Sequence, residues 1–177
     1  MSAAATFENR VAAVMPDLFR FAMSITRNRE TAADLSQDAA ALALTKRDSF
    51  ESGTDLRAWL FRLQVNLHRN TLRKERNRKR LEQEHSPLQA HDLALPSQVD
   101  SLRYREAYKA IEALPPLQRQ VLFLVVHDGK TYDEAAQILE IDKGTVKSRL
   151  NRARQALADA IDYEHGREVG TTREFGR

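Results

Sequence analysis

Two stretches with helical spacing of apolar residues, separated by an aperiodic segment, constrain this chain more than any other feature. The segment at residues 85–100 contains Pro87, Pro96 and two serines, and no apolar repeat runs through it. An unstructured stretch of this length is unusual inside one compact domain, so it marks a boundary between two domains. We therefore predict domains at residues 1–84 and 101–163, a flexible linker at residues 85–100 and a disordered polar tail at residues 164–177.

Helical periodicity and composition together favour an all-α fold in both domains. The 177-residue chain has only six glycines and is 7% aromatic, and helix formers such as alanine, leucine and arginine are abundant in it. Asn28 is a predicted N-cap, and Asp48 to Asp55 is a predicted loop because small polar residues dominate it. The next helix should carry one apolar stripe at i, i+4, i+7 and i+11, formed by Leu56, Leu60, Leu63 and Leu67.

The composition excludes several classes of protein. The chain has no cysteine, which excludes disulfides, thiolate metal sites and a cysteine nucleophile. Its five histidines lack the spacing of metal ligands, and we expect no metal, no cofactor and no catalytic residue. Because there is no 18-residue apolar run and no secretory pattern at the N-terminus, we expect a cytoplasmic protein with no membrane insertion of its own.

The second domain contains the outline of a helix-turn-helix. Thr131 and Glu134 form a predicted capping box that starts a short helix ending at Leu139. A three-residue break separates this helix from a longer one, from Lys143 to about Ile161. The buried stripe predicted on the longer helix consists of Val146, Leu150, Ala153, Leu157 and Ile161.

Polar side chains fall away from that stripe in the first turns of the longer helix. Arginine and lysine bond guanine edges, asparagine bonds adenine edges, and serine or lysine can hold phosphates. A recognition helix reads bases with its N-terminal part, which is where these residues lie. A solvated charged face is the alternative, but the capping box and tight turn favour DNA binding by Lys147, Ser148, Arg149, Asn151 and Arg152.

A second basic element lies near the C-terminal end of the first domain. Between Arg69 and Arg80 the chain has seven basic residues against one acidic residue. A solubilising helix end would explain one such run, but a basic stripe in each of two domains indicates a polyanionic partner such as DNA.

These residues also resemble a known family, the sigma-70 factors of RNA polymerase. The first domain is similar to the family's second conserved region in four places: DLSQD from Asp34, the loop with Phe50, LRAWLFR from Leu56, and Asn66. The second domain is similar to the fourth region in three more: LPPLQR from Leu114, YDEAA from Tyr132, and GTVKSRLNRAR from Gly144. No counterpart of the first and middle regions of larger sigma factors is found. This is the layout of the extracytoplasmic-function (ECF) group.

The resemblance implies a function and partners. It implies a sigma factor, not an enzyme, that binds core RNA polymerase and directs recognition of the minus-35 and minus-10 elements and transcription initiation, in a stress response. Its partners would be the core polymerase, promoter DNA and an anti-sigma factor. The docking residues for the clamp helices of the β′ subunit would be Asp34, Gln37 and Asp38.

The resemblance also implies two DNA-binding sets. The loop from Asp48 to Asp55, with Phe50, would capture a flipped base of the minus-10 element, and the polar residues at the end of the next helix would face the melted strand. The minus-10 set is therefore Phe50, Asn66, Arg69, Asn70 and Arg73. The minus-35 set is Lys147, Ser148, Arg149, Asn151 and Arg152.

Two positions depart from the family pattern. Ser36 stands where an apolar residue is commoner, and Ala39-Ala40-Ala41 follow where bulky residues are usual. Both affect the contacts expected around the docking helix.

Two other classes of protein fit this sequence less well. Asp128 to Thr131 resembles the end of a phosphate-binding loop, but Leu124 stands where that motif needs glycine, and a helix end followed by a helix start explains the string better. Asp34 and Asp38 could be paired acids of an enzyme, although docking or solvation fits them better. The second class is an ordinary helix-turn-helix regulator whose first domain is a sensor. It is disfavoured because the first domain has its own basic helix and shows no obvious ligand pocket, such as a glycine-rich loop.

Overall fold

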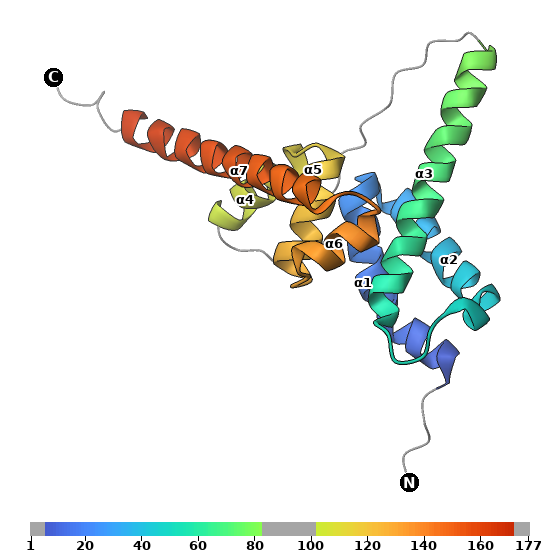
Figure 1. The fold of residues 1–177 in the computed structure, drawn as a ribbon. Coiled ribbons are helices and arrows are strands. Elements are labelled where there is room, and N and C mark those ends of the chain that lie inside the picture. The colour runs from blue at the N-terminus through green and yellow to red at the C-terminus, as the bar shows by residue number, and fades with distance from the viewer. Residues whose placement is uncertain (1–5, 83–101, 172–177) are drawn as a thin grey trace, which may run out of the picture.

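The structure, a computed structural model, describes residues 6–82 and 102–171. This part of the chain is helical and contains no strand, as predicted (Figure 1). The predicted linker at residues 85–100 lies outside the described residues. In chain order the elements are α1 (Phe7–Thr26), α2 (Arg29–Thr45), the 3₁₀ helix η1 (Arg47–Ser49), α3 (Leu56–Glu82), α4 (Leu102–Ala113), α5 (Pro116–Leu122), the π-helix η2 (Phe123–His127), α6 (Tyr132–Leu139) and α7 (Lys143–Thr171).

Helices α1, α2 and α3 form the first helical block. Asn28 caps α2 as predicted, because its side chain accepts a hydrogen bond from the backbone N–H of Thr31 at 2.8 Å. In the leucine stripe of α3, Leu56 and Leu60 are buried and the other two leucines are half-buried. The rings of Phe21 and Phe61, both fully buried, lie 4.5 Å apart between α1 and α3.

A polar pair in this core explains why a serine occupies position 36. The Ser36 hydroxyl donates to the carbonyl of Ala32 at 2.7 Å and accepts from Gln64 Nε2 at 3.3 Å. Gln64 Nε2 also donates to the carbonyl of Leu18 at 3.0 Å, so the pair joins all three helices. Buried polar groups are tolerated when they are hydrogen-bonded, and an apolar residue at position 36 would remove an acceptor from Gln64.

Helices α4 to α7 form the second helical block and include the predicted helix-turn-helix. The capping box is confirmed: the Thr131 side chain accepts from the N–H of Glu134, and the Glu134 carboxylate accepts from the N–H of Thr131 at 2.7 Å. Gly129 has a φ of +67°, in the left-handed region that glycine favours at a helix end. The segment before it is not one regular α-helix, because α5 gives way to the π-helix η2.

Helix α7 is longer than the apolar pattern indicates. The pattern ends near Ile161, but the helix continues to Thr171 and therefore overlaps the tail expected at residues 164–177. No proline interrupts residues 162–171, and extending an existing helix needs no new nucleus. Residues 172–177 lie outside the described residues.

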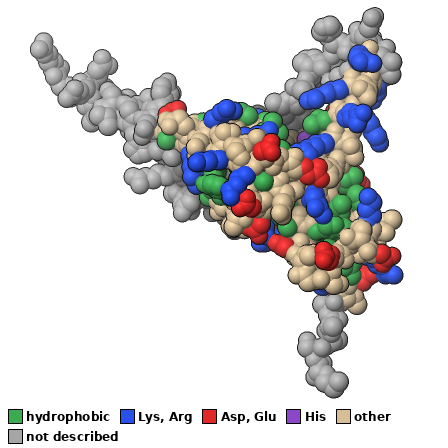
Figure 2. All heavy atoms as spheres, in the orientation of Figure 1, with side chains coloured by type: hydrophobic (Ala, Val, Ile, Leu, Met, Phe, Trp, Pro, Cys, Tyr) green, Lys and Arg blue, Asp and Glu red, His purple; other side chains and the backbone are tan. Residues whose placement is uncertain are grey.

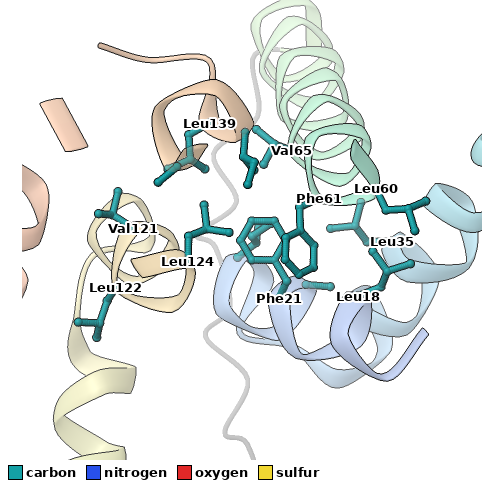
Figure 3. Close-up of a cluster of buried hydrophobic side chains, with 14 of the residues drawn as sticks. Leu18, Phe21, Leu35, Leu60, Phe61, Val65, Val121, Leu122, Leu124 and Leu139 are labelled. Atoms are coloured by element: carbon teal, nitrogen blue, oxygen red, sulfur yellow. The ribbon is translucent and has the colours of Figure 1, made fainter. Parts of the chain in front are cut away.

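The two blocks pack together through one continuous core. Phe123 of η2 lies 5.4 Å from Phe21 and 6.2 Å from Phe61 between ring centroids. Figure 3 shows Leu124 facing these rings and Leu139 of α6 beside Val65 of α3. The contacts between α1 and α5 and between α3 and α6 therefore hold a closed arrangement, which the sequence did not predict.

Truncating the centre of the stripe on α7 should destabilise the second block. Leu150 has no exposed surface, so Leu150→Ala is expected to cost about 2–5 kcal/mol of unfolding free energy through lost burial and a residual cavity. Leu157→Ala, on the same stripe but half-buried, serves as the control and should cost less. Thermal and urea unfolding monitored by circular dichroism measure both. Equal losses for the two variants would contradict the packing described here.

Candidate nucleic-acid interface

The four α3 residues of the minus-10 set share one face of the helix. Asn66, Arg69, Asn70 and Arg73 are spaced i, i+3, i+4 and i+7, which places them in a row along a helix surface. Asn66 is half-buried and the other three are exposed. Lysine and arginine side chains continue along the end of α3 that projects from the body of the molecule (Figure 2).

The fifth residue of that set, Phe50, is placed differently. Its ring is 8% exposed and packs 5.7 Å from the ring of Phe7 and 5.3 Å from that of Trp59, with the Arg10 guanidinium over it at 5.5 Å. The rest of the predicted loop, residues 48–55, is exposed, and Gly53 adopts a φ of +93° that favours glycine. Phe50 therefore anchors the loop in the core and does not present its ring to solvent.

The minus-35 set occupies the first turns of α7. Val146, Leu150 and Ala153 are fully buried, which directs Lys147, Asn151 and Arg152 outward as exposed side chains. Ser148 and Arg149 are half-buried, and the Ser148 hydroxyl donates to the carbonyl of Thr145 at 3.0 Å.

The two sets meet at the turn of the helix-turn-helix. Asn66 Nδ2 donates to Glu140 Oε1 at 3.0 Å, and Arg69 Nη1 donates to Glu140 Oε2 at 3.3 Å. Arg69 also donates to the carbonyl of Leu139 at the end of α6. Burial lowers the pKa of Arg149, and the positive charges of Arg69 and Arg152 lower it further, so a guanidinium group of α3 lies near those of α7.

A second ionic contact joins the blocks beside the start of α3. Arg57 pairs with Asp17 and with Asp128, each at 3.1 Å, and Lys130 pairs with Asp55. Burial raises the pKa of Asp128, whose side chain is 5% exposed, although Arg57 and Lys130 oppose the rise. Burial acts in the same sense on Asp55, but hydrogen bonds from Lys130 and from the backbone N–H of Ala58 outweigh it, and its pKa is lowered.

Arg119, which belongs to the LPPLQR string, is a buried cation to which the sequence alone assigns no role. The residue is 4% exposed, and burial lowers its pKa to about 10. Arg119 Nε donates to the carbonyl of Ser24 at 2.7 Å, and Nη1 donates to the carbonyls of Glu112 at 2.8 Å and Leu114 at 3.2 Å. It therefore satisfies carbonyls at the C-terminal ends of α1 and α4, one in each block.

The docking residues form a separate surface. Asp34, Gln37 and Asp38 are all exposed on α2, and the opposite side of the helix buries Leu35 and Ala39. Ala39 and Ala43 have no exposed surface, so the small residues after the docking string line the contact of α2 with its neighbours.

Comparison with known proteins assigns both blocks to one family. Residues 10–78 match the model of Sigma-70 region 2, and residues 104–157 match the model of Sigma-70, region 4. The ECF RNA polymerase sigma factor EcfG of Rhodopseudomonas palustris is 38% identical over 158 residues, which cover 89% of this chain and 86% of the relative. The chain belongs to the ECF group of the sigma-70 family.

Further relatives agree with this assignment. The ECF RNA polymerase sigma-E factor of Escherichia coli is 30% identical over 139 residues, 72% of each chain. The solved sigma factor RpoE of Bartonella quintana, in complex with the anti-sigma factor NepR, superposes with a TM-score of 0.75 at 35% identity, over 88% of this chain and 96% of that one. This sigma factor accordingly acts in promoter recognition and transcription initiation.

Within the described residues, none of the helices is both long enough and apolar enough to span a membrane.

Proposed function

We propose that this sigma factor reads the minus-35 element with α7 and the melted minus-10 strand with the polar face of α3, in the cytoplasm and without catalysis of its own. The observation that carries the proposal is the pair of outward polar faces, each built on a helix whose opposite side is buried. The minus-35 readers are Lys147, Ser148, Arg149, Asn151 and Arg152. Asn66, Arg69, Asn70 and Arg73 face the strand, and Phe50 acts indirectly by holding the loop at residues 48–55 in shape.

The exposed face of α2 is the proposed contact with core polymerase. Asp34, Gln37 and Asp38 present two carboxylates and an amide to solvent, which suits a basic or polar docking surface such as the β′ clamp helices.

Reversing one of these charges should weaken core binding. Asp38→Lys is expected to lower the affinity for core polymerase because it places a positive charge against a surface that is complementary to a carboxylate. Since position 38 is exposed, the fold should stay intact. Pull-down of core enzyme at increasing salt measures the loss. Asp159→Lys, the same exchange at an exposed position on α7, is the matched control. If both variants retain core as well as the parent does, the docking assignment is wrong.

An anti-sigma factor is the proposed regulator, in a stress response. The Bartonella quintana relative was solved with one, and its match covers both blocks of this chain. A partner that contacts both blocks would hold them in the closed arrangement.

A sigma factor depends on core polymerase for tight promoter binding, unlike a helix-turn-helix regulator that binds promoters alone. A gel shift with and without core enzyme separates the two, because two small DNA-binding surfaces must be held at a defined separation before both can bind one duplex. Tight, sequence-specific duplex binding by the chain alone would favour the regulator.

A further inference from the structure

The turn of the helix-turn-helix carries an unusual residue at a conformationally restricted position. Glu140 follows α6 in the left-handed region, with φ 49° and ψ 52°. Glycine or asparagine is favoured there, and a glutamate is disfavoured by contacts of its Cβ. Its carboxylate, 47% exposed, leaves the second block and reaches α3, more than seventy positions earlier in the chain.

The α3 atoms that Glu140 engages are nucleic-acid-binding groups. An arginine guanidinium and an asparagine amide are donors that bind phosphate oxygens and base edges. In the closed arrangement, Asn66 Nδ2 donates to one oxygen of the Glu140 carboxylate and Arg69 Nη1 donates to the other. Arg69 is further held by the carbonyl of Leu139, so the second block covers one end of the strand-facing row.

Like charges also meet at this contact. Burial is the main cause of the lowered pKa of Arg149, and the Arg69 charge adds to it, so the closed arrangement brings a cation of α3 near a cation of α7. Glu140 is the carboxylate hydrogen-bonded to Arg69 in this cluster. Without it, the cations of α3 and α7 would repel one another across the contact.

We propose that Glu140 occupies the strand-facing row of α3 in place of the DNA backbone, so that the closed chain blocks its own single-strand surface. A melted promoter strand and Glu140 compete for Asn66 and Arg69, and the blocks must separate at this contact before the strand binds. The inference rests on the proposed role of α3 and adds a means of regulation within the chain itself.

Substitution at position 140 tests this without disturbing the fold. Glu140→Asn suits the left-handed backbone and is too short to span the contact, whereas Glu140→Gln keeps the length and loses the charge. Asp159→Asn removes one negative charge elsewhere on α7, where the carboxylate accepts a hydrogen bond from Gln155 of the same helix, and is the matched control. Because the natural chain has no cysteine, the pair Lys74→Cys and Gln155→Cys, both at exposed positions, accepts dyes that report the separation of α3 and α7.

The binding measurement uses the free full-length chain and a fluorescent single-stranded DNA oligonucleotide. An exposed ion pair contributes about 0.2–1 kcal/mol, so Glu140→Asn should bind the oligonucleotide up to about fivefold more tightly than the parent. Glu140→Gln should fall between them and Asp159→Asn should match the parent. The gain should vanish when Arg69→Ala is added. The distance between the dyes should lengthen in Glu140→Asn, as it should when the oligonucleotide binds the parent.

Three results would overturn the proposal: equal affinities for Glu140→Asn and Asp159→Asn, a longer distance with no gain in strand affinity, or a gain that survives Arg69→Ala. Promoter-dependent transcription by the parent with core enzyme is measured separately. Its failure would count against the proposed function, whereas intact transcription together with any of those three results would count against the role of Glu140 alone.

Discussion

Replacing Arg149 or Arg152 by alanine should abolish transcription from promoters that need a minus-35 element, while binding of core polymerase survives. Both arginines lie in the first turns of α7, and a bidentate contact to a base is worth about 1–3 kcal/mol of discrimination, or roughly 5- to 150-fold. Core binding is expected to persist because the docking face belongs to α2. Run-off transcription and core pull-down measure the two effects.

Two controls separate reading from folding in that experiment. Arg154→Ala removes an exposed arginine from the same helix outside the proposed readers, and it should remain active. Arg149 is half-buried, so its variant is also tested by thermal melting, whereas Arg152 is exposed and its variant should melt as the parent does. If Arg149→Ala and Arg152→Ala are both fully active, the charged face of α7 is only a solvated surface.

The second large effect is expected at Arg119. Arg119→Met replaces the guanidinium by an apolar chain and leaves the carbonyls of Ser24, Glu112 and Leu114 without this donor. Each buried acceptor left unsatisfied costs about 1–3 kcal/mol, and the carbonyls of Ser24 and Leu114 are buried, so the loss in unfolding free energy should be at least about 2 kcal/mol. Chemical denaturation measures it.

Arg119 also serves to test the joint between the blocks. Arg119 lies in α5 and donates to the carbonyl of Ser24 in α1. Its removal should therefore lower the melting temperature and also make the two blocks melt in separate transitions. Arg119→Lys keeps the charge, but a single ammonium group cannot reach the carbonyls at both helix ends as the guanidinium does. The stability of this variant should therefore lie between that of the parent and that of Arg119→Met. A methionine variant as stable as the parent, melting in a single transition, would contradict the role given to this residue.

The features that local sequence determines were predictable, and those that depend on distant partners were not. The Asn28 cap and the Thr131–Glu134 box are decided within four residues, and the structure confirms both. The burial of Phe50 depends on Phe7 and Trp59, and the role of Ser36 depends on Gln64, so no local pattern reveals them.

The same distinction applies to the candidate interface. The spacing of Asn66 and Arg69 on one face follows from helix geometry, but their contact with Glu140 depends on how the blocks pack. The one local indication of that contact is a glutamate where a helix-ending turn favours glycine or asparagine.

The central claim is that this chain gives core polymerase its promoter specificity. Run-off transcription with the purified chain and core enzyme, on a library of templates in which the minus-35 and minus-10 elements vary independently, tests it most directly. We predict transcripts that need both the chain and the core enzyme and that are lost when either element of an active promoter is scrambled. Transcripts that do not depend on the chain, or that persist with both elements scrambled, would contradict the claim.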